Sequence, residues 1–409
     1  MSQNHVYYFD NNATTCVAPE VLEAMLPFLQ NEYGNPSSMY SFAGRAQQAV
    51  KEARAQVASL LGATPEEIVF TSCGTESDST AIYAALNARP EKRHFITSKV
   101  EHSAILAVGN HLATKGYTVT FLDVDSMGNL DMDTLRSSLT SETALVSVMM
   151  ANNETGTLFP VEEIAALCKE RGVPFHTDAV QAAGKLPLNM ATLPVDYLSI
   201  SGHKLHAPKG VGALYVRRGA PFRTFMRGGH QENGRRAGTE AVPSVVALGQ
   251  ACKLAREHFD QETVSVKALR DNLESRLLAA TPDSIINGNP AFRLPNTTNI
   301  SFKYVEGEAI LLLLDALGIC ASSGSACTSG SLEPSHVLRA MGVPFTYAHG
   351  SVRLSLSRFN TQQEVDFVVE KLPAIIERLR AISPYKHIDD DAVPDSCLSC
   401  NSTSCGHNG

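Results

Sequence analysis

The sequence is marked first by what it lacks. It has no apolar run long enough to span a membrane, because the longest, residues 309–314, ends at Asp315. It has no basic excess, since 34 lysines and arginines stand against 42 acidic residues, and the formal charge of −8 argues against non-specific nucleic-acid binding. Its first five residues form neither a basic nor an apolar leader, so we expect no signal peptide and a cytoplasmic protein.

The nine cysteines also lack a regular pattern, and their odd number does not suit a complete disulfide framework. Together with the absence of an export signal, their scattered spacing indicates reduced thiols. They are Cys16, Cys73, Cys168, Cys252, Cys320, Cys327, Cys397, Cys400 and Cys405.

What the chain does contain is a core. Its 409 residues, 44% of them hydrophobic, are enough for more than one domain. Short apolar segments alternate with helical ones, which predicts an α/β fold: a large domain with a mainly parallel seven-stranded sheet flanked by helices, plus a smaller α+β domain. The expected strands are 68–71, 94–97, 118–122, 144–150, 174–177, 197–201 and 211–216, and the expected helices are 18–31, 43–61, 76–86, 103–115, 161–171, 242–259 and 266–280.

The predicted domain boundaries follow the same pattern. Residues 15–258 form the large domain, and residues 1–14 and 259–385 form the small domain, which carries Cys327. Residues 386–409 are rich in Asp, Pro, Ser and Cys, and we expect them to be a disordered, cysteine-containing tail.

Polar or glycine-rich residues follow many of the predicted strands, where open α/β sheets bind their ligands. They lie at 72–76, 101–102, 152–154, 178–181 and 201–204. Gly74 and Thr75 open a predicted helix, and free N–H groups at a helix start suit a phosphate group, although Thr75 could equally be an N-cap. Ser201, His203 and Thr239 could supply further donors.

Asp178 follows a buried strand, where a carboxylate needs a cationic partner. A protonated ring nitrogen of a planar cofactor would serve, and Gln181 could reach a hydroxyl of the same ring. The alternative for Asp178 is an N-cap role in the next turn.

Lys204 ends a predicted strand after Gly202 and His203, where a lysine near other cations could form a Schiff base. His102 could stack on a planar ring and transfer protons. The alternatives are a solvated lysine and a hydrogen-bonded histidine at a strand end.

Two further features concern a substrate. Arg353 alternates with apolar residues, as in a half-buried strand, and suits bidentate capture of a carboxylate unless it forms a structural ion pair. Asn35 and Asn153 are possible amide partners for substrate or cofactor. Cys327 lies among glycines and serines, where a mobile thiolate could take up a group and pass it on.

The sequence resembles cysteine desulfurases, which are class V, fold type I pyridoxal-phosphate enzymes, over roughly residues 6–382. The motifs that carry the resemblance to this family and to its nitrogenase-associated, NifS-like branch are DNNATT at 10–15, YGNPSS at 33–38, TSCGTESDST at 71–80, NNETGTLFP at 152–160, Asp178 with Gln181, SGHKLHAPKG at 201–210, GGHQE at 228–232, RRAGTE at 235–240 and SGSACTSGSLEP at 323–334. Cys73 stands where many relatives have glycine, which fits the NifS-like branch.

The resemblance implies a role for each residue. Lys204 holds pyridoxal phosphate as a Schiff base and moves protons, His102 stacks on the ring and assists as acid or base, and Cys327 is the nucleophile. The implied cofactor ligands are Gly74, Thr75, His102, Asn153, Asp178, Gln181, Ser201, His203 and Lys204, with Thr239 from the partner subunit of a homodimer, and the implied substrate ligands are Asn35, Asn153 and Arg353.

The implied reaction converts L-cysteine to L-alanine and leaves a persulfide on Cys327, from which an iron–sulfur scaffold protein takes the sulfur, for nitrogenase or for general cluster assembly. Cys327 would there contact the nascent cluster transiently. Neither a nucleic acid nor a membrane is expected as a partner.

Three alternatives remain open at this stage. The chain could be an aminotransferase or a selenocysteine lyase of the same fold, or a non-enzymatic iron–sulfur or metal-binding protein that uses Cys397, Cys400, Cys405 and His407 of the tail. The tail could otherwise be incidental, or relay sulfur.

Overall fold

The computed structural model describes residues 5–323 and 334–384. Its largest element is a seven-stranded sheet with the order β2-β8-β7-β6-β5-β3-β4. Neighbouring strands are parallel except at β8, which is antiparallel to both β2 and β7. The strands are β2 (Ile68–Thr71), β3 (His94–Ser98), β4 (Thr118–Leu122), β5 (Thr143–Ser147), β6 (Phe175–Asp178), β7 (Tyr197–Ser201) and β8 (Gly212–Val216). The predicted mainly parallel α/β sheet is confirmed.

Most predicted strands match the observed ones to within a residue at each end, but the strand predicted at 144–150 ends early. The apolar run continues after β5, yet Met149 and Ala151 line a cavity at the edge of the sheet instead of extending the strand. A uniform apolar run does not distinguish a strand from the buried loop that follows it.

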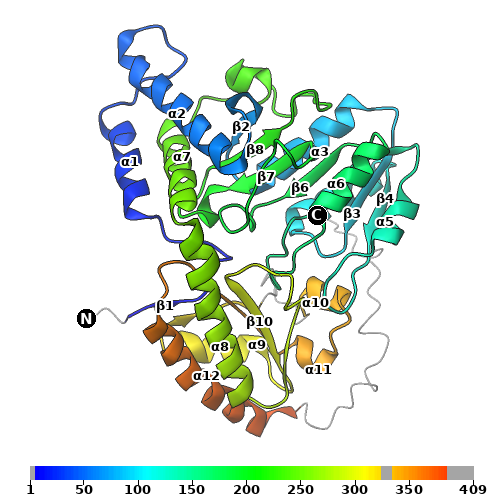
Figure 1. Cartoon of the computed structure of the whole chain (residues 1–409), viewed down its shortest axis with the longest axis vertical. Helices are drawn as coiled ribbons and strands as arrows, with labels where there is room; N and C mark the ends of the chain where they lie inside the picture. The colour runs from blue at the N-terminus through cyan, green and yellow to red at the C-terminus, as the bar shows by residue number, and fades with distance from the viewer. Residues whose placement is uncertain (1–4, 324–333, 385–409) are drawn as a thin grey trace, which may run out of the picture.

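Helices cover both faces of the sheet (Figure 1). Alternate residues of β2 show the two layers, since Ile68 and Phe70 pack into the core on one face and Val69 into the core on the other. The first core includes α1 (Pro19–Gln30), α2 (Gly44–Leu61), α5 (Met132–Ser138), α6 (Val161–Glu170) and α7 (Val242–Glu257), and the second includes α3 (Gly74–Ala88) and α4 (Ser103–Thr114).

A smaller antiparallel sheet has its own core in the lower part of Figure 1. Its strands, in spatial order, are β12 (Ser351–Ser355), β10 (Thr297–Phe302) and β9 (Ser284–Ile286), and the helices beside it are α8 (Val266–Ala280), α9 (Gly307–Asp315), α10 (His336–Ala340), α11 (Phe345–Ala348) and α12 (Gln362–Ile382). A single π-helical turn, η5 (Gln261–Ser265), connects α7, which packs in the core of the large sheet, to α8, which packs in the core of the small sheet.

The N-terminal segment joins the two parts. β1 (Tyr7–Tyr8) pairs in parallel with β11 (Ile319–Cys320), beside the small core. The chain then crosses to the large sheet, where the Thr15 N–H donates to the His203 carbonyl at 3.0 Å and the Ala18 N–H donates to the His206 carbonyl at 3.0 Å. Over the ranges that the structure describes, no helix has both the length and the apolar character needed to cross a membrane.

Candidate active site

A cavity of about 340 Å³ opens at the carboxyl ends of the parallel strands, between the large sheet and the small one. It collects ten of the predicted site residues: Gly74, Thr75, His102, Asn153, Asp178, Gln181, Ser201, His203, Lys204 and Arg353. Asn12, Ala13, Cys73, Asp78, Met149, Ala151 and Val180 complete the lining. The residues come from widely separated segments, so the topology of the sheet brings them together.

One end of the cavity suits an anion. α3 begins at Gly74, with Cys73 rather than Thr75 as its N-cap residue. Cys73, Gly74 and Thr75 all line the cavity, so the start of the helix, with its free N–H groups, forms part of the cavity wall. A Cβ atom at position 74 would lie 2.9 Å from Cγ2 of Val180 and 3.4 Å from Cβ of Ser201, which explains the glycine. The Ser201 hydroxyl is buried and has no hydrogen-bond partner among the described residues.

His203 lies beside the same end of the cavity. Its Nδ1 is 3.2 Å from the Thr14 hydroxyl. Burial, with the positive charge of Lys204 as the second cause, lowers the pKa of His203 to about 4. The ring is therefore neutral near pH 7, and can contribute a hydrogen bond rather than a full charge to an anion.

Asp178 is the last residue of β6, and its side chain is buried. One carboxylate oxygen accepts the Val180 N–H at 2.8 Å, so the capping alternative is real, but the residue also lines the cavity. Burial raises the pKa of Asp178, which means that the site lacks enough positive charge to stabilise the carboxylate fully. A cationic ring nitrogen in the cavity would supply it.

Gln181 reaches the cavity from the turn after β6. Its Nε2 donates to the Asn12 carbonyl at 2.9 Å, while its Oε1 is buried without a partner among the described residues. An unpaired buried acceptor costs free energy, about 1–3 kcal/mol, unless a ligand donates to it. The ring hydroxyl of a planar cofactor is such a donor.

Lys204 does not end a strand as predicted; it is the last residue of η3 (Gly202–Lys204), a single 3₁₀ turn after β7. Its Nζ donates to the Ala13 carbonyl at 2.7 Å and also to the Asn12 carbonyl. Burial lowers the pKa of Lys204 to about 7, with Arg353 as the second cause. A large fraction of the amine is therefore neutral and nucleophilic near pH 7.

His102 is the N-cap residue of α4 and lines the cavity. Its Nδ1 accepts the Ala104 N–H at 3.2 Å, so a neutral ring carries its proton on Nε2. The expected strand-end hydrogen bond and the expected cavity position are therefore both present. The ring is exposed toward the cavity, where a planar group could stack on it.

Arg353 lies on β12, which is buried along its whole length rather than half-buried as predicted. Its Nη2 pairs with Oδ1 of Asp10 at 2.7 Å and its Nη1 donates to the Asn153 carbonyl at 2.9 Å. Its Nε is buried without a partner in the described part of the chain. The expected ion pair and the expected cavity position thus occur together, and Asp10 fixes the guanidinium plane.

Two predicted site residues that the structure describes do not line the cavity of this chain. Asn35 and Thr239 are exposed and lie outside the lining. The Asn35 side chain instead accepts the Ser37 N–H at 2.9 Å. Cys327, with the predicted transient cluster contact, falls outside the described residues, as do the tail cysteines and His407. Within the described ranges, no group of three or more metal-ligating side chains is present.

Sequence reasoning missed two polar residues of the cavity. Asn12 belongs to a motif that we used for the resemblance, but its role needs the tertiary structure, because its carbonyl accepts from both Gln181 and Lys204. Asp78 is buried on the inner side of α3, with Oδ1 3.6 Å from Nε2 of His176. Its position four residues after Gly74, one helical turn away, is the only signal that could have indicated it.

The donor set fits pyridoxal phosphate. An anion seat with an unpaired hydroxyl, a buried carboxylate short of positive charge, and a partly neutral lysine are the three groups that its phosphate, ring nitrogen and carbonyl carbon require.

Comparison with known proteins agrees with a pyridoxal-phosphate site. A family model described as Aminotransferase class-V matches residues 7–368. A cysteine desulfurase of Nostoc sp. is 63% identical over 382 residues, which cover 93% of this chain and 96% of that protein. Cysteine desulfurase NifS of Azotobacter vinelandii is 57% identical over 379 residues, which cover 92% and 94% of the two chains. The solved structure of a NifS-like protein matches with a TM-score of 0.86 at 39% identity, over 92% of this chain and 100% of that one.

The chain therefore belongs to the class-V aminotransferase family. Within that family it is a cysteine desulfurase, an enzyme that uses pyridoxal phosphate and takes L-cysteine as its substrate. The predicted family, fold and cofactor are confirmed, and the alternatives of an aminotransferase and of a non-enzymatic metal-binding protein fall away.

Proposed function

We propose that the cavity binds pyridoxal phosphate and L-cysteine and that the sulfur of cysteine is transferred to Cys327. The observation that carries the proposal is the convergence of ten predicted residues on one cavity. The proposed cofactor ligands are Gly74, Thr75, Ser201 and His203 for the phosphate, Asp178 for the ring nitrogen, Gln181 and Asn153 for the ring hydroxyl and face, His102 as the stacking ring, and Lys204 as the covalent attachment.

The substrate carboxylate is assigned to Arg353, with Asn35 as an amide partner. The ion pair with Asp10 and the Asn153 carbonyl orient the guanidinium, so that its entropy is lost before the substrate arrives. An arginine fork that is held in place binds a carboxylate more tightly than a free one.

When bound, the cofactor supplies an electron sink for the substrate amine carbon. Lys204 moves the proton at that carbon, and its partly neutral state near pH 7 suits this task. The Cys327 thiolate attacks the substrate sulfur: a sulfur–sulfur bond forms, the carbon–sulfur bond breaks, and its electron pair stays with the carbon, which is protonated to the methyl group of alanine. A persulfide remains on Cys327.

Two variants test this assignment. Lys204→Ala should remove the visible absorbance of the holoenzyme and alanine formation together. Cys327→Ala should keep the absorbance and lose alanine formation from cysteine. A Lys204→Ala protein that still binds the cofactor covalently, or a Cys327→Ala protein with normal turnover, would overturn the respective role. Selenocysteine as substrate tests the remaining alternative, since a selenocysteine lyase would turn it over without Cys327.

We further infer a homodimer in which Thr239 and Asn35 serve the partner's cavity. Both are exposed and outside the cavity of their own chain, and a large exposed apolar group lies close to Asn35 in sequence. That group is Tyr33, Met39, Tyr40 and Phe42, with Met39 fully exposed. Mixing Thr239→Ala and Lys204→Ala subunits should restore turnover, because a mixed dimer holds one site with both residues; no restoration would place Thr239 in its own chain's site.

The persulfide sulfur is proposed to pass to an iron–sulfur scaffold protein, where Cys327 contacts the nascent cluster transiently. A role in nitrogenase assembly is supported by the likeness to the protein named NifS, whereas other relatives are named only as cysteine desulfurases. Disrupting the gene and comparing nitrogenase activity with that of other iron–sulfur enzymes tests it: loss of nitrogenase activity alone supports the specific role, and loss of both contradicts it.

The domain division at 15–258, with 1–14 and 259–385 as the small domain, is part of the same proposal. The tail from 386 to 409 should be dispensable for chemistry. Deleting it should leave alanine formation unchanged, and lost turnover would contradict that expectation. Metal analysis of the purified full chain and of the shortened chain tests whether Cys397, Cys400, Cys405 and His407 bind a metal.

A further inference from the structure

A second, much smaller cavity of about 20 Å³ lies against Lys204. Its walls include another lysine, Lys185, and three further charged or titratable side chains, His206, Glu262 and Arg358. Lysine and glutamate are seldom buried unless they are paired, yet Lys185 is only 8% exposed and Glu262 only 6%. The reaction described above uses none of these four side chains.

Lys185 belongs to the turn that carries Gln181. Its Nζ donates to the Gln181 carbonyl at 3.2 Å, four residues back along the chain. The Gln181 side chain in turn donates to the Asn12 carbonyl, which also accepts from Lys204. Lys185 and Lys204 are therefore linked through two intervening residues, and both line the same small cavity.

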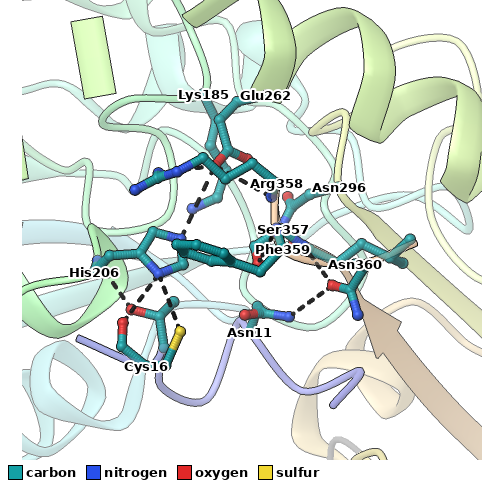
Figure 2. A network of polar contacts seen from close by, with 12 residues as sticks. Asn11, Cys16, Lys185, His206, Glu262, Asn296, Ser357, Arg358, Phe359 and Asn360 are labelled. Carbon is teal, nitrogen blue, oxygen red and sulfur yellow. Dashed lines mark hydrogen bonds and ion pairs between the residues drawn. The ribbon is translucent and has the colours of Figure 1, made fainter. Parts of the chain in front are cut away.

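Glu262 reaches this cluster from η5, the π-helical turn between α7 and α8. Its Oε1 lies 3.3 Å from Nη1 of Arg358 and 4.0 Å from Nε2 of His206. Figure 2 shows Lys185, Glu262 and Arg358 gathered beside the ring of His206. The carboxylate thus comes from the connection between the two cores, and single-turn π-helices often mark functional sites.

His206 and Arg358 line the small cavity from two further segments of the chain. His206 follows Lys204 by two residues, and its Nδ1 lies 3.0 Å from the Cys16 carbonyl of the N-terminal segment. Arg358 follows β12, the strand of Arg353, by a short connection. Three of the four side chains therefore come from segments that also carry Gln181, Lys204 or Arg353.

We propose that Lys185 is a positioning residue for Lys204: its buried ammonium, which donates to the Gln181 carbonyl in a small cavity that Glu262 also lines, fixes the Gln181 turn and places a positive charge beside the cofactor lysine, which favours the neutral amine of Lys204.

The charges around Lys204 agree with this arrangement. Positive charge on Arg353 and then on Lys185 lowers its pKa after burial, while Asp10 and Asp178 act against them. Burial lowers the pKa of Lys185 to about 8, and Glu262 opposes that shift, so that a substantial fraction of Lys185 remains charged near pH 7. The other titratable groups that face the two lysines are His102, His203, His206 and Arg358.

The inference rests on Lys204 being the cofactor lysine, and one experiment tests the role of Lys204 and the role of Lys185 separately. Apoprotein is mixed with pyridoxal phosphate between about pH 5.5 and 9, and the rate at which the visible absorbance of the attached cofactor appears is recorded. Only the neutral amine reacts, so this rate rises with pH through the pKa of Lys204. Lys204→Ala should show no such absorbance; if it does, the proposed function itself is wrong, whatever Lys185 does.

Lys185→Gln removes the charge but keeps a donor for the Gln181 carbonyl. The midpoint, the pH at which the attachment rate of this variant is half-maximal, should move upward by roughly half a pH unit or more, so that attachment of the cofactor at pH 7 slows about three-fold or more. Lys185→Arg, which keeps the charge, should hold the midpoint of the wild type. Lys253→Met, at an exposed lysine of α7, is the matched control and should change nothing.

A Lys185→Gln midpoint equal to that of the wild type would overturn the proposal, and so would an equal upward shift in Lys185→Arg. If Lys185→Gln does not fold, as judged by circular dichroism, Lys185→Met is measured in the same way and decides the question by the same criterion.

Discussion

The side-chain nitrogen of Lys204 lies 2.7 Å from the carbonyl oxygen of Ala13, although 191 positions separate the two residues. The amine is therefore anchored on main-chain oxygens of the N-terminal segment. Main-chain acceptors are supplied by any residue type, so the sequence contains no chemical sign of this contact. The geometry has measurable consequences for each part of the site.

The ion pair between Asp10 and Arg353 should govern substrate affinity. Asp10→Asn leaves the guanidinium without its charged partner, so we expect KM for L-cysteine to rise about ten-fold, with a smaller change in kcat. Steady-state alanine formation measures both constants. Asp133→Asn removes the exposed pair with Arg136 and should change neither. A fall in kcat alone for Asp10→Asn would contradict the positioning role.

Gly74→Ala should weaken cofactor binding. The added methyl group would meet Val180 and Ser201 at the proposed phosphate end, so we expect a dissociation constant for pyridoxal phosphate about ten-fold higher, which an absorbance titration of the apoprotein measures. Gly44 is also the first residue of a helix, and a Cβ there meets nothing within 4 Å. Gly44→Ala should therefore leave the constant unchanged, and an equal loss in both variants would refute the steric argument.

Glu101, next to His102, should make stability depend on pH. Burial raises the pKa of this carboxyl from 4.5 to about 8. Because the folded-state pKa is raised, the wild type loses stability as pH rises from about 4.5 to about 8, by at most about 5 kcal/mol. Glu101→Gln lacks this loss, so urea unfolding should show its stability relative to wild type improving with pH over that window. A pH-independent difference would show that Glu101 is not protonated in the folded protein.

Glu274 and Arg293 form a buried bidentate pair between α8 and the connection that precedes β10. Both nitrogen–oxygen distances are 2.6 Å, and the Thr298 hydroxyl donates to the same carboxylate. Glu274→Gln should leave the guanidinium uncompensated and cost about 3–5 kcal/mol in urea unfolding. Asp366→Asn, which breaks the half-exposed pair with Arg276, should cost less than about 1 kcal/mol. Similar losses in the two variants would contradict this ranking.

The sequence predicts the parts of the site that follow strands of the large sheet. Asp178, Ser201 and His102 lie where a parallel sheet places its ligand edge, and the apolar strands before them are visible as short hydrophobic runs. These contacts follow from local pattern and from one rule of topology, which is why nine of the ten predicted cavity residues converge; the tenth, Arg353, comes from β12 of the small sheet.

Contacts and strand directions that depend on distant parts of the chain cannot be predicted from the sequence. The antiparallel direction of β8 is invisible, because its apolar pattern resembles that of its parallel neighbours. Asn12 and Asp78 carry no local mark of their role, and Lys185 looks like an ordinary surface lysine until burial and Glu262 are known. Pairings over hundreds of residues depend on packing of whole elements, which no window of the sequence contains.

The N-terminal segment that supports Lys204 also sets the order of assembly. Asp10 pairs with Arg353, and Asn11 donates to the Ser355 carbonyl at the end of the same strand, so the N-terminal segment and β12 meet beside Lys204. A ribosome has to release nearly the whole polypeptide before these contacts can form. Loading with pyridoxal phosphate is accordingly an event of the finished protein, and a chain truncated before β12 should be synthesised without ever acquiring colour.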